Sequence, residues 1–386
     1  MKGFFNLSHL SAGFTTVLVG YTSSVVIVIQ AATASGANPA QIESWLLTLG
    51  VVMGLTSILY SWFYKTPIVT AWSTPAAVML AASAGQYSLP VVIGAFMFSG
   101  ALFTLTGMLA PLTRALSKIP VPLGTAMLGA ILLPFCAKAF TPLTDTPALF
   151  ALLFTSYLLA KHFVPRYTML VLLLVSLGSA LALGSFQHAD LALRIATPIW
   201  VMPEFDWLAI LNLALPLYLI TMLSQNLPGI AMLKSYQYDA PIKPILVGTG
   251  LATLMSAPFG GFSVNLAAIS AAICMNEDVD QDKAQRYRAV LWAGGFYLLA
   301  GIFAALVVNL FLALPKPISA MLAGLALLGT LMMCLQSAFK IDEYREPAIL
   351  TFVITLSGAT LFGMSATLIG LVIGLAYLRL TTRPRP

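Results

Sequence analysis

The stretch Pro67-Ile-Val-Thr-Ala-Trp-Ser-Thr-Pro-Ala-Ala77 interrupts an apolar segment that would otherwise form a single membrane helix. Its first part, Ile68-Val-Thr70, favours extended backbone, and Ser73-Thr-Pro75 contains the residue types that begin a helix. A Ser or Thr hydroxyl accepts a backbone N–H that the first helical turn leaves unpaired, and Pro fits the first helical position. The sequence therefore predicts a short extended run followed by a half-helix that begins near mid-membrane.

A second stretch has the same organisation 190 residues later. Phe259-Gly-Gly-Phe-Ser-Val-Asn265 precedes a small-residue helix predicted over 266–273, and Trp72-Ser73 aligns with Phe262-Ser263. Interrupted segments at corresponding places in two halves of a chain are typical of a transporter binding site. Two half-helices with opposed orientations would direct their amino termini at one point.

The composition places these stretches in a membrane protein. Hydrophobic residues make up 59% of the 386 residues and charged residues 8%, whereas globular domains average about 25% charged residues. The start of the chain runs into a full-length apolar segment, which we interpret as an anchor and not as a cleavable signal peptide. The three cysteines are far apart in apolar surroundings and predict buried free thiols.

Breaks at Pro, Gly and charged residues divide the chain into fourteen segments. The predicted segments are 13–34, 42–63, 67–84, 88–110, 120–139, 147–162, 167–186, 208–233, 243–260, 262–276, 287–313, 318–339, 346–363 and 365–380. With a cytoplasmic amino terminus, all Lys and Arg except Lys138, Arg194 and Lys316 fall on the inside. Both termini are therefore predicted to be cytoplasmic. The basic residues are topology signals on this interpretation, and nucleic-acid binding is not expected.

Fourteen segments divide into seven and seven, so the second half would enter the membrane with opposite orientation. Ile119-Pro-Val-Pro-Leu-Gly-Thr-Ala-Met-Leu-Gly129 opens segment five, and Leu314-Pro-Lys-Pro-Ile-Ser-Ala-Met-Leu-Ala-Gly324 opens segment twelve. Both Pro residues and the final Gly match at an offset of 195. The predicted fold class is an all-α polytopic membrane protein with fourteen transmembrane segments in a 7+7 inverted repeat, in which segments three and ten are broken half-helices with short strands.

We expect all 13 Asp and Glu residues to lie outside the long apolar segments, so that no acidic relay crosses the membrane. Two helix amino termini present unpaired N–H groups and partial positive charge, which suit an anion such as a carboxylate. The alternative is that Thr74 and Ser263 cap local kinks. Non-helical backbone at membrane depth is tolerated mainly beside a cavity or within protein, which favours a binding site.

Segment eight contains a polar cluster, Ser224-Gln-Asn-Leu-Pro-Gly229. Amide side chains in a membrane helix need partners, and Pro228 frees backbone acceptors one turn earlier. Gln225 and Asn226 are thus predicted to contact substrate, although bonding between helices is the alternative. Trp72 is either a cavity-lining residue or a packed core residue. The three histidines form no cluster, so neither a metal site nor a general base is predicted.

At the stretches GYTSS (20–24), AWSTP (71–75), SQNLPGI (224–230) and APFGGFS (257–263), the chain resembles the benzoate transporter (BenE) family of bacterial inner-membrane proteins. The resemblance extends over nearly the whole length. It implies proton-linked transport of benzoate or a similar aromatic carboxylate, and a 7+7 inverted-repeat fold shared with uracil/xanthine permeases and sulfate/bicarbonate anion transporters. It also implies a core domain (1–110 and 208–313) that moves against a gate domain (111–207 and 314–386).

The chain differs from the uracil and xanthine permeases in segments eight and ten. Those permeases use membrane-embedded glutamates in these segments for base recognition and proton coupling. Here the corresponding regions contain Gln225, Asn226, Ser263 and Asn265. A fixed negative charge would repel an anionic ligand, so the absence of carboxylates favours an organic anion. The proton could then travel on the substrate as the neutral acid, without a titrating side chain in the membrane.

The sequence thus predicts a secondary-active transporter of the bacterial inner membrane and not an enzyme, with no cofactor and no metal, for a small organic anion. A nucleobase permease of the same fold and an anion channel are the alternatives, and proton coupling and a homodimer are left open. Substrate contact is predicted for Thr22, Ser73, Thr74, Pro75, Gln225, Asn226, Phe262, Ser263, Val264 and Asn265, with Tyr21, Trp72 and Phe259 as aromatic lining.

Overall fold

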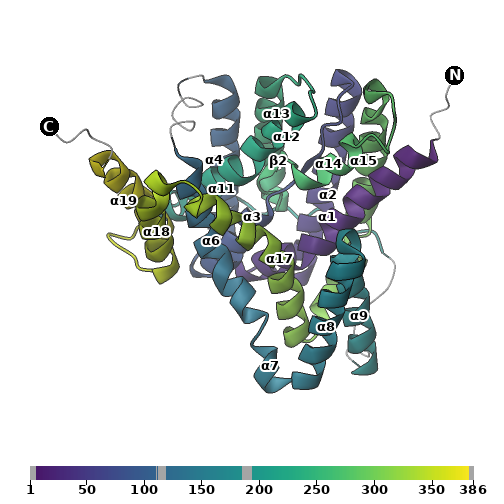
Figure 1. Cartoon of the computed structure of the whole chain (residues 1–386), viewed down its shortest axis with the longest axis horizontal. Coiled ribbons are helices and arrows are strands. Elements are labelled where there is room, and N and C mark those ends of the chain that lie inside the picture. Colours follow the sequence, from purple (N-terminus) through teal and green to yellow (C-terminus); the bar gives the residue numbers. More distant parts are fainter. Residues whose placement is uncertain (1–5, 110, 112–118, 185–193, 382–386) are drawn as a thin grey trace.

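A computed structural model describes residues 6–109, 111, 119–184 and 194–381 of the chain (Figure 1). Its elements are mainly helices, which form two packing groups. The first group comprises α1 (Leu7–Ala34), α2 (Pro39–Tyr64), α3 (Thr74–Ser83), α4 (Leu89–Met108), the helical run 207–235 (α10, η3, α11, η4 and α12), α13 (Ile242–Ser256), α14 (Ile269–Met275), α15 (Tyr287–Ile302) and α16 (Ala304–Leu312). The second comprises α6 (Val121–Lys138), α7 (Pro142–Asp145), α8 (Pro147–Phe163), α9 (Thr168–Ala182), α17 (Lys316–Phe339), α18 (Asp342–Ser357) and α19 (Ala366–Thr381).

Each group is held together by pairs of helices that are distant in sequence. In the first group α2 packs on α15, α4 on α13, and α1 on α3 and α15. In the second, α6 packs on α17 and α18, and α18 on α19. The two groups meet where α1 contacts α17 and where α3 contacts α6, near the middle of the molecule (Figure 1).

Small residues let the paired helices approach closely. Gly50 and Gly54 of α2 face Gly301 and Gly294 of α15, and a Cβ on Gly50 would lie 2.6 Å from the Cα of Gly301. Close approach of this kind is the usual way in which membrane helices associate, because lipid provides no hydrophobic force between them.

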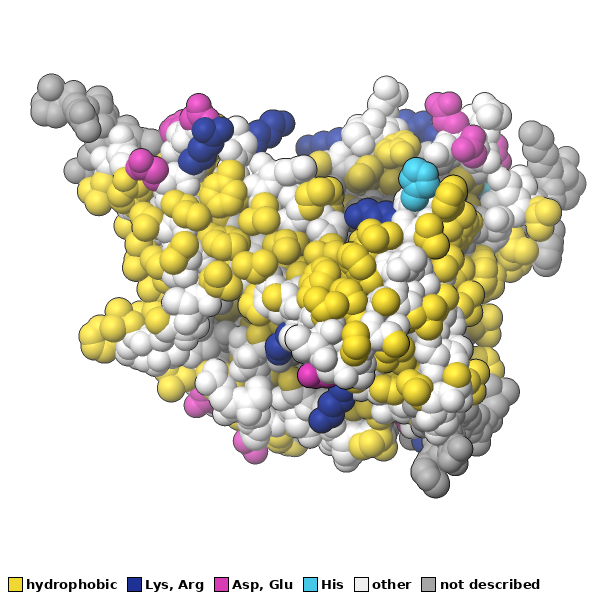
Figure 2. Space-filling model, turned by 60° about the horizontal axis from the view of Figure 1, so that its bottom comes forward, with side chains coloured by type: hydrophobic (Ala, Val, Ile, Leu, Met, Phe, Trp, Pro, Cys, Tyr) yellow, Lys and Arg dark blue, Asp and Glu magenta, His cyan; other side chains and the backbone are white. Residues whose placement is uncertain are grey.

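Each of the fourteen predicted segments coincides with a helix, a run of helices, or a strand followed by a helix. Within the described residues, eight helices are long and apolar enough to cross a membrane, or nine if α15 and α16, which meet at a 62° bend, form one crossing. Figure 2 shows a broad hydrophobic band across the molecule, with charged side chains gathered along the upper edge. The chain is therefore a mostly helical polytopic membrane protein, as predicted.

Both predicted breaks are present, and the two extended runs pair with each other. Strand β1 (Thr70–Trp72) and strand β2 (Val264–Leu266) form an antiparallel ladder in which Ala71 lies opposite Asn265. The helix starts within the predicted Ser73-Thr-Pro75, but the cap is Ser73 and not Thr74, because the Ser73 hydroxyl accepts the N–H of Ala76 at 3.2 Å. Segment three is thus a strand followed by a half-helix.

The prediction for the start of the second half-helix was wrong by three residues. Leu266 belongs to β2, and α14 begins at Ile269 with Ala268 as its N-cap. The pairing with β1 and a bond from the Leu266 N–H to the side chain of Asn226 keep this residue extended. Ser73 and Ala268, the two N-caps, are 195 positions apart, which is the offset of the Pro-x-Pro motifs and not the predicted 190.

The expectation that no acidic side chain lies within an apolar segment was also wrong. Glu43 lies in α2 and is 3% exposed. Its Oε1 is 2.6 Å from Nη2 of Arg194, a residue of the connection that precedes α10. The Arg partner lies 151 positions away, so the ion pair that makes this burial tolerable is not visible in the local sequence.

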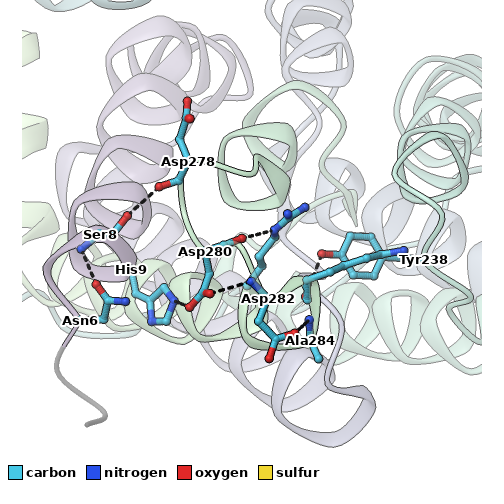
Figure 3. Close-up of polar contacts among 10 residues, drawn as sticks. Asn6, Ser8, His9, Tyr238, Asp278, Asp280, Asp282 and Ala284 are labelled. Carbon is cyan, nitrogen blue, oxygen red and sulfur yellow. Dashed lines mark hydrogen bonds and ion pairs between the residues drawn. The ribbon is translucent and has the colours of Figure 1, made fainter. Parts of the chain in front are cut away.

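A polar network ties the start of α1 to the connection between α14 and α15 (Figure 3). His9 is 1% exposed, and its Nε2 lies 2.9 Å from Oδ2 of Asp280. Ser8 donates to the carbonyl of Asp278 at 3.0 Å, and Arg286 donates to the carbonyls of Asp280 and Met275. Because Met275 is the last residue of α14, the network fixes the end of that half-helix against α1.

Candidate functional site

A cavity of about 520 Å³ lies between the two packing groups. The first group contributes residues of α1, β1, α3, the η4–α12 turn, α14 and α15, and the second contributes residues of α6 and α17. This volume lies within the range of about 300 to 1,000 Å³ that is typical of small-molecule sites. The cavity is therefore large enough for an organic ligand.

The wall formed by the first group combines polar and apolar side chains. Hydroxyl and amide side chains line it from four elements: Ser23, Ser24, Thr74, Ser224, Gln225 and Ser270. Thr74 is the first residue of α3, and Ser270 is the second residue of α14. The starts of both half-helices thus contribute to the same cavity, as the paired breaks predicted.

The two half-helices differ in how their amino termini are satisfied. The hydroxyl of Ser73 occupies one donor at the start of α3, and Pro75 has no N–H to offer. At the start of α14 no side chain caps the helix, because Ala268 stands at the N-cap. The backbone N–H groups in the first turn of α14 therefore have no capping side chain, and a bound anion can accept hydrogen bonds from them.

The opposite wall, from the second group, is also mixed. One face of α17 contributes Leu327, Thr330, Cys334 and Ser337, at the spacing of successive helical turns. Val121 and Leu128 of α6 complete this wall with Thr125, whose hydroxyl is bonded to backbone carbonyls of its own helix. Both walls thus combine hydroxyl groups with apolar side chains, whereas the Gln225 amide and the starts of the two half-helices lie on the side of the first group.

Trp72 lies on the cavity wall at the end of β1. Its Nε1 donates to the hydroxyl of Ser24 at 2.9 Å, and the ring of Tyr21 meets it edge-on at a centroid distance of 4.9 Å. The indole is thereby held by one hydrogen bond and one aromatic contact. Of the two readings of this residue, the structure favours a cavity-lining tryptophan.

The neighbours Gln225 and Asn226 have different surroundings. Both lie in η4 (Met222–Asn226), a π-helical turn, and such turns are frequent at functional sites. Gln225 lines the cavity. Asn226 is fully buried, and its Oδ1 accepts the N–H of Leu266 at 3.0 Å, so its side chain positions β2.

The other predicted contacts lie behind the cavity wall. Thr22 bonds to the carbonyl of Leu18 within its own helix, and Ser263 adopts a positive φ of 44° at the turn into β2. Val264 and Asn265 pair with β1, and the Asn265 amide donates to the carbonyl of Ser263. These residues shape the platform from which the half-helices start.

The predicted aromatic residues of segment ten also pack away from the cavity. Phe262 lies in a buried cluster with Trp45 and Phe96. Phe259 lies edge-on to Trp200 of the connection before α10. Gly260 between them needs its positive φ of 93°, and a Cβ at this position would collide with the ring of Trp45.

Sequence reasoning did not single out the contribution of α6 and α17, nor that of Ser270 and Tyr297. The stripe of Thr330, Cys334 and Ser337 on one face of an apolar helix was the available signal. Across the described ranges, no group of three or more His, Cys, Asp and Glu is placed to hold a metal ion.

Comparison with known sequences gives a consistent result. The sequence profile of the BenE family, described as "Benzoate membrane transport protein", matches residues 3–380. The "Inner membrane protein YdcO" of Escherichia coli (strain K12) is 40% identical over 365 residues, covering 95% of this chain and 93% of that protein. The "Benzoate membrane transport protein" of Acinetobacter baylyi is 35% identical over 385 residues, covering 100% of this chain and 98% of that protein.

Comparison with solved structures identifies the fold. A structure described as "The overall structure of SLC26A9" has a TM-score of 0.67 and 14% sequence identity, and the match covers 98% of this chain and 66% of that chain. "The transmembrane domain of a cyanobacterium bicarbonate transporter BicA" has a TM-score of 0.64 and 16% identity, covering 97% of this chain and 98% of that chain. At these identities the likeness shows the fold alone.

Proposed function

Because this chain belongs to the benzoate membrane transport protein family, we propose that it transports benzoate or a similar aromatic carboxylate by a secondary-active mechanism. Members of the family are membrane transporters and not enzymes, and the relative from Escherichia coli is named an inner membrane protein. The chain is accordingly a multi-pass protein of the bacterial inner membrane. The substrate and the mechanism are the proposal.

The observation that supports this substrate class is that one cavity brings the starts of the two half-helices and the Gln225 amide together with apolar side chains. An aromatic carboxylate has one charged end and one apolar end, so it can use both kinds of group. We place the carboxylate at the uncapped start of α14, within reach of Thr74 and Gln225. A helix amino terminus stabilises an anion by about 0.3 to 1 kcal/mol at the surface and up to about 2 kcal/mol when partly buried.

The ring would then lie toward Leu128 and Leu327, with Trp72 at its edge. Apolar burial contributes roughly 25 cal/mol for each Å² removed from water, and an edge-on aromatic contact adds about 0.5 to 1.5 kcal/mol. A ligand of this size must be recognised at both its carboxylate and its ring. Neither the electrostatic contribution nor the apolar contribution alone greatly exceeds the free energy that is lost when the ligand gives up its translational and rotational freedom.

We further propose that the fourteen segments cross the membrane as a 7+7 inverted repeat with core and gate domains as predicted. The recurring offset of 195 in two separate elements supports the repeat. The two packing groups support the division into core (1–110 and 208–313) and gate (111–207 and 314–386), and the cavity lies between them.

In this arrangement the cavity faces the cytoplasm. Its lining extends to Val121 at the start of α6, Met232 near the end of α12 and Ser337 near the end of α17. Each of these ends is cytoplasmic in the predicted topology. The structure therefore corresponds to an inward-facing state of an alternating-access cycle, in which the core domain moves against the gate domain.

The test is transport by the purified protein in proteoliposomes. We expect uptake of labelled benzoate that excess unlabelled benzoate abolishes and that uracil and xanthine leave unchanged. Benzoate should also raise the unfolding temperature, because a ligand of the native state stabilises it by mass action. Uptake of labelled uracil or xanthine without uptake of labelled benzoate would instead identify a nucleobase permease.

An anion channel is the second candidate, because the similar folds include anion transporters. Voltage-clamp recording of reconstituted protein separates the two mechanisms. A carrier gives no single-channel events, whereas unitary benzoate currents would contradict the proposed carrier mechanism.

A further inference from the structure

Asn212 joins the two packing groups at the end of the molecule away from the cavity mouth. It lies in η3 (Ile210–Ala214), a second π-helical turn of the run 207–235, and is 6% exposed. Its Nδ2 donates to the carbonyl of Gly363 at 2.6 Å and to the hydroxyl of Tyr87 at 3.2 Å. Its Oδ1 accepts the N–H of Ser365 at 2.7 Å.

These partners belong to different groups. Asn212 and Tyr87 belong to the first group, since η3 packs against α4 and Tyr87 precedes that helix. Gly363 and Ser365 belong to the turn between α18 and α19 of the second group. Leu208 supports the contact, because its side chain packs against Gly363.

The side of the membrane follows from the helix directions. The turn 358–365 precedes α19, whose last residues lie on the same side as the start of α1 (Figure 1). In the predicted topology that side is cytoplasmic, so the turn and Asn212 lie at the outer side. The cavity lining, in contrast, extends to the cytoplasmic ends of α6, α12 and α17.

We propose that Asn212 is a positioning residue of the transport cycle that closes the outer side of the protein while the cavity is open to the cytoplasm. We call Asn212 and the turn residues Gly363 and Ser365 the outer latch. The proposal rests on the proposed alternating-access mechanism, since it is the separation of core from gate that would open the latch.

The physical reason is the complementarity of one amide with two backbone groups. An amide both donates and accepts, so Asn212 satisfies a carbonyl and an N–H of the same turn. Opening the latch breaks the hydrogen bonds between the Asn212 amide and the backbone of the turn, and water must replace them. This cost raises the free energy of the outward-facing state. The latch therefore biases the resting protein toward the inward-facing state without touching the substrate.

The side-chain chemistry offers matched variants. Asn212→Asp preserves size and the acceptor but removes both donors, and it places a carboxylate oxygen against the carbonyl of Gly363. Ser365→Ala is the control, because the latch uses only the backbone N–H of this residue. Tyr87→Phe removes one bond that lies within the first group, so it should not affect closure.

Ser337 on α17 provides the readout, because it lines the cavity near the cytoplasmic end of the helix and is only partly buried. It is replaced by Cys in a reporter protein in which the three native cysteines, all of them buried, are replaced by Ala. A small membrane-impermeant thiol reagent is added to inside-out vesicles, and the labelling rate of the Ser337→Cys thiol is measured. The rate reports the inward-facing population and requires no transport.

We expect Asn212→Asp to lower the labelling rate by about threefold or more, as the loss of a buried hydrogen bond predicts, while Ser365→Ala and Tyr87→Phe leave it unchanged. Equal rates in Asn212→Asp and the reporter protein would overturn the proposal. If labelling shifts as expected but benzoate is not transported, the outer latch is supported and the proposed substrate is wrong.

A cross-link tests the same inference without depending on the stability of Asn212→Asp. In the pair Asn212→Cys and Ser365→Cys, made in a protein without the native cysteines, oxidation should hold the latch closed. Transport should then stop, and a reductant should restore it. Full transport by the oxidised, cross-linked protein would show that these two residues do not separate during the cycle, which contradicts the proposal.

Discussion

Gln225 and Asn226 are adjacent amides in one helical turn, yet only the first lines the cavity. The sequence predicted that both contact substrate, because a polar cluster in an apolar segment indicates a site without indicating which way each side chain points. The direction depends on the π-helical turn η4, which changes the register of the helix face. The structure therefore assigns the two residues different tasks.

Gln225→Ala should weaken benzoate binding while leaving the protein folded. The change removes an amide that lines the cavity and, unlike Asn226, does not hold a strand in place. We expect a rise of about tenfold in the dissociation constant, the equivalent of about 1.4 kcal/mol for one lost hydrogen bond to a charged group. Isothermal titration in detergent measures it.

Asn226→Ala is the matched comparison. It leaves the Leu266 N–H buried without its acceptor, which costs about 1 to 3 kcal/mol of stability. The unfolding temperature should therefore fall in Asn226→Ala and stay constant in Gln225→Ala. A lower unfolding temperature in Gln225→Ala but not in Asn226→Ala would contradict the structural role of Asn226 and the binding role of Gln225.

Ala268→Asp should abolish benzoate binding, because a carboxylate at the start of α14 occupies the donors and repels the ligand. Ala268→Asn has nearly the same volume without the charge and serves as the control. We expect binding to be weakened by at least about tenfold more in the Asp variant than in the Asn variant, consistent with electrostatic differences of 1 to 2 kcal/mol at helix termini. Equal affinities of the Asp and Asn variants for benzoate would show that the carboxylate does not bind at the start of α14.

At the scale of elements, the sequence predicted both broken segments and the helix start within Ser73-Thr-Pro75, because Pro, Ser and Thr act locally. It did not predict that the extended runs pair as β1 and β2, since the ladder joins residues 192 to 196 positions apart. The start of α14 was misplaced for the same reason. Local signals locate a break, whereas its bounds depend on partners elsewhere in the chain.

The cavity wall from α6 and α17 shows the same limit. These helices were expected to belong to the gate domain, but no polar motif identified them as lining. Their side chains become relevant only because α6 packs against α17 and both face α1 and α3. The stripe of Thr330, Cys334 and Ser337 marks one face of α17, but whether that face meets a cavity depends on packing and could not be predicted from the sequence.

Gly50→Ala should destabilise the pairing of α2 with α15. The added Cβ would lie 2.6 Å from Gly301 and 2.8 Å from the carbonyl of Tyr297, so the helices must move apart. Overpacking of this kind typically costs about 1 to 3 kcal/mol, which thermal unfolding in detergent can measure. Gly295→Ala on α15 is the control, since no atom lies within 4 Å of its added Cβ; an equal loss in both variants would contradict close packing at Gly50.

At the scale of the whole molecule, the buried acid Glu43 allows a test of proton coupling. Its partner Arg194 belongs to the connection before α10, and both lie at the outer end of α2 in the predicted topology. We propose that the proton travels on the substrate as the neutral acid, so Glu43→Gln should preserve proton uptake with benzoate. Arg194→Gln leaves the buried acid without this partner and should lower stability by about 1 kcal/mol, because the Arg194 side chain is 48% exposed and solvent screens the pair.

The measurement is acidification inside proteoliposomes during benzoate uptake. If Glu43→Gln transports benzoate without moving protons, this carboxylate is the proton carrier and the substrate-borne proton is excluded. Unfolding temperatures of both variants establish whether any loss of transport comes from loss of folded protein.

The two-stranded ladder has a consequence for the energetics of the cycle. Because β1 and β2 join the starts of α3 and α14 within one packing group, the carboxylate end of the proposed site should move as one unit in the proposed cycle. The free energy of binding the carboxylate should then be the same on both sides of the membrane, whereas the contacts of the ring with α6 and α17 change. A difference between the benzoate affinities measured from the periplasm and from the cytoplasm should accordingly disappear when Leu128 and Leu327 are replaced by Ala.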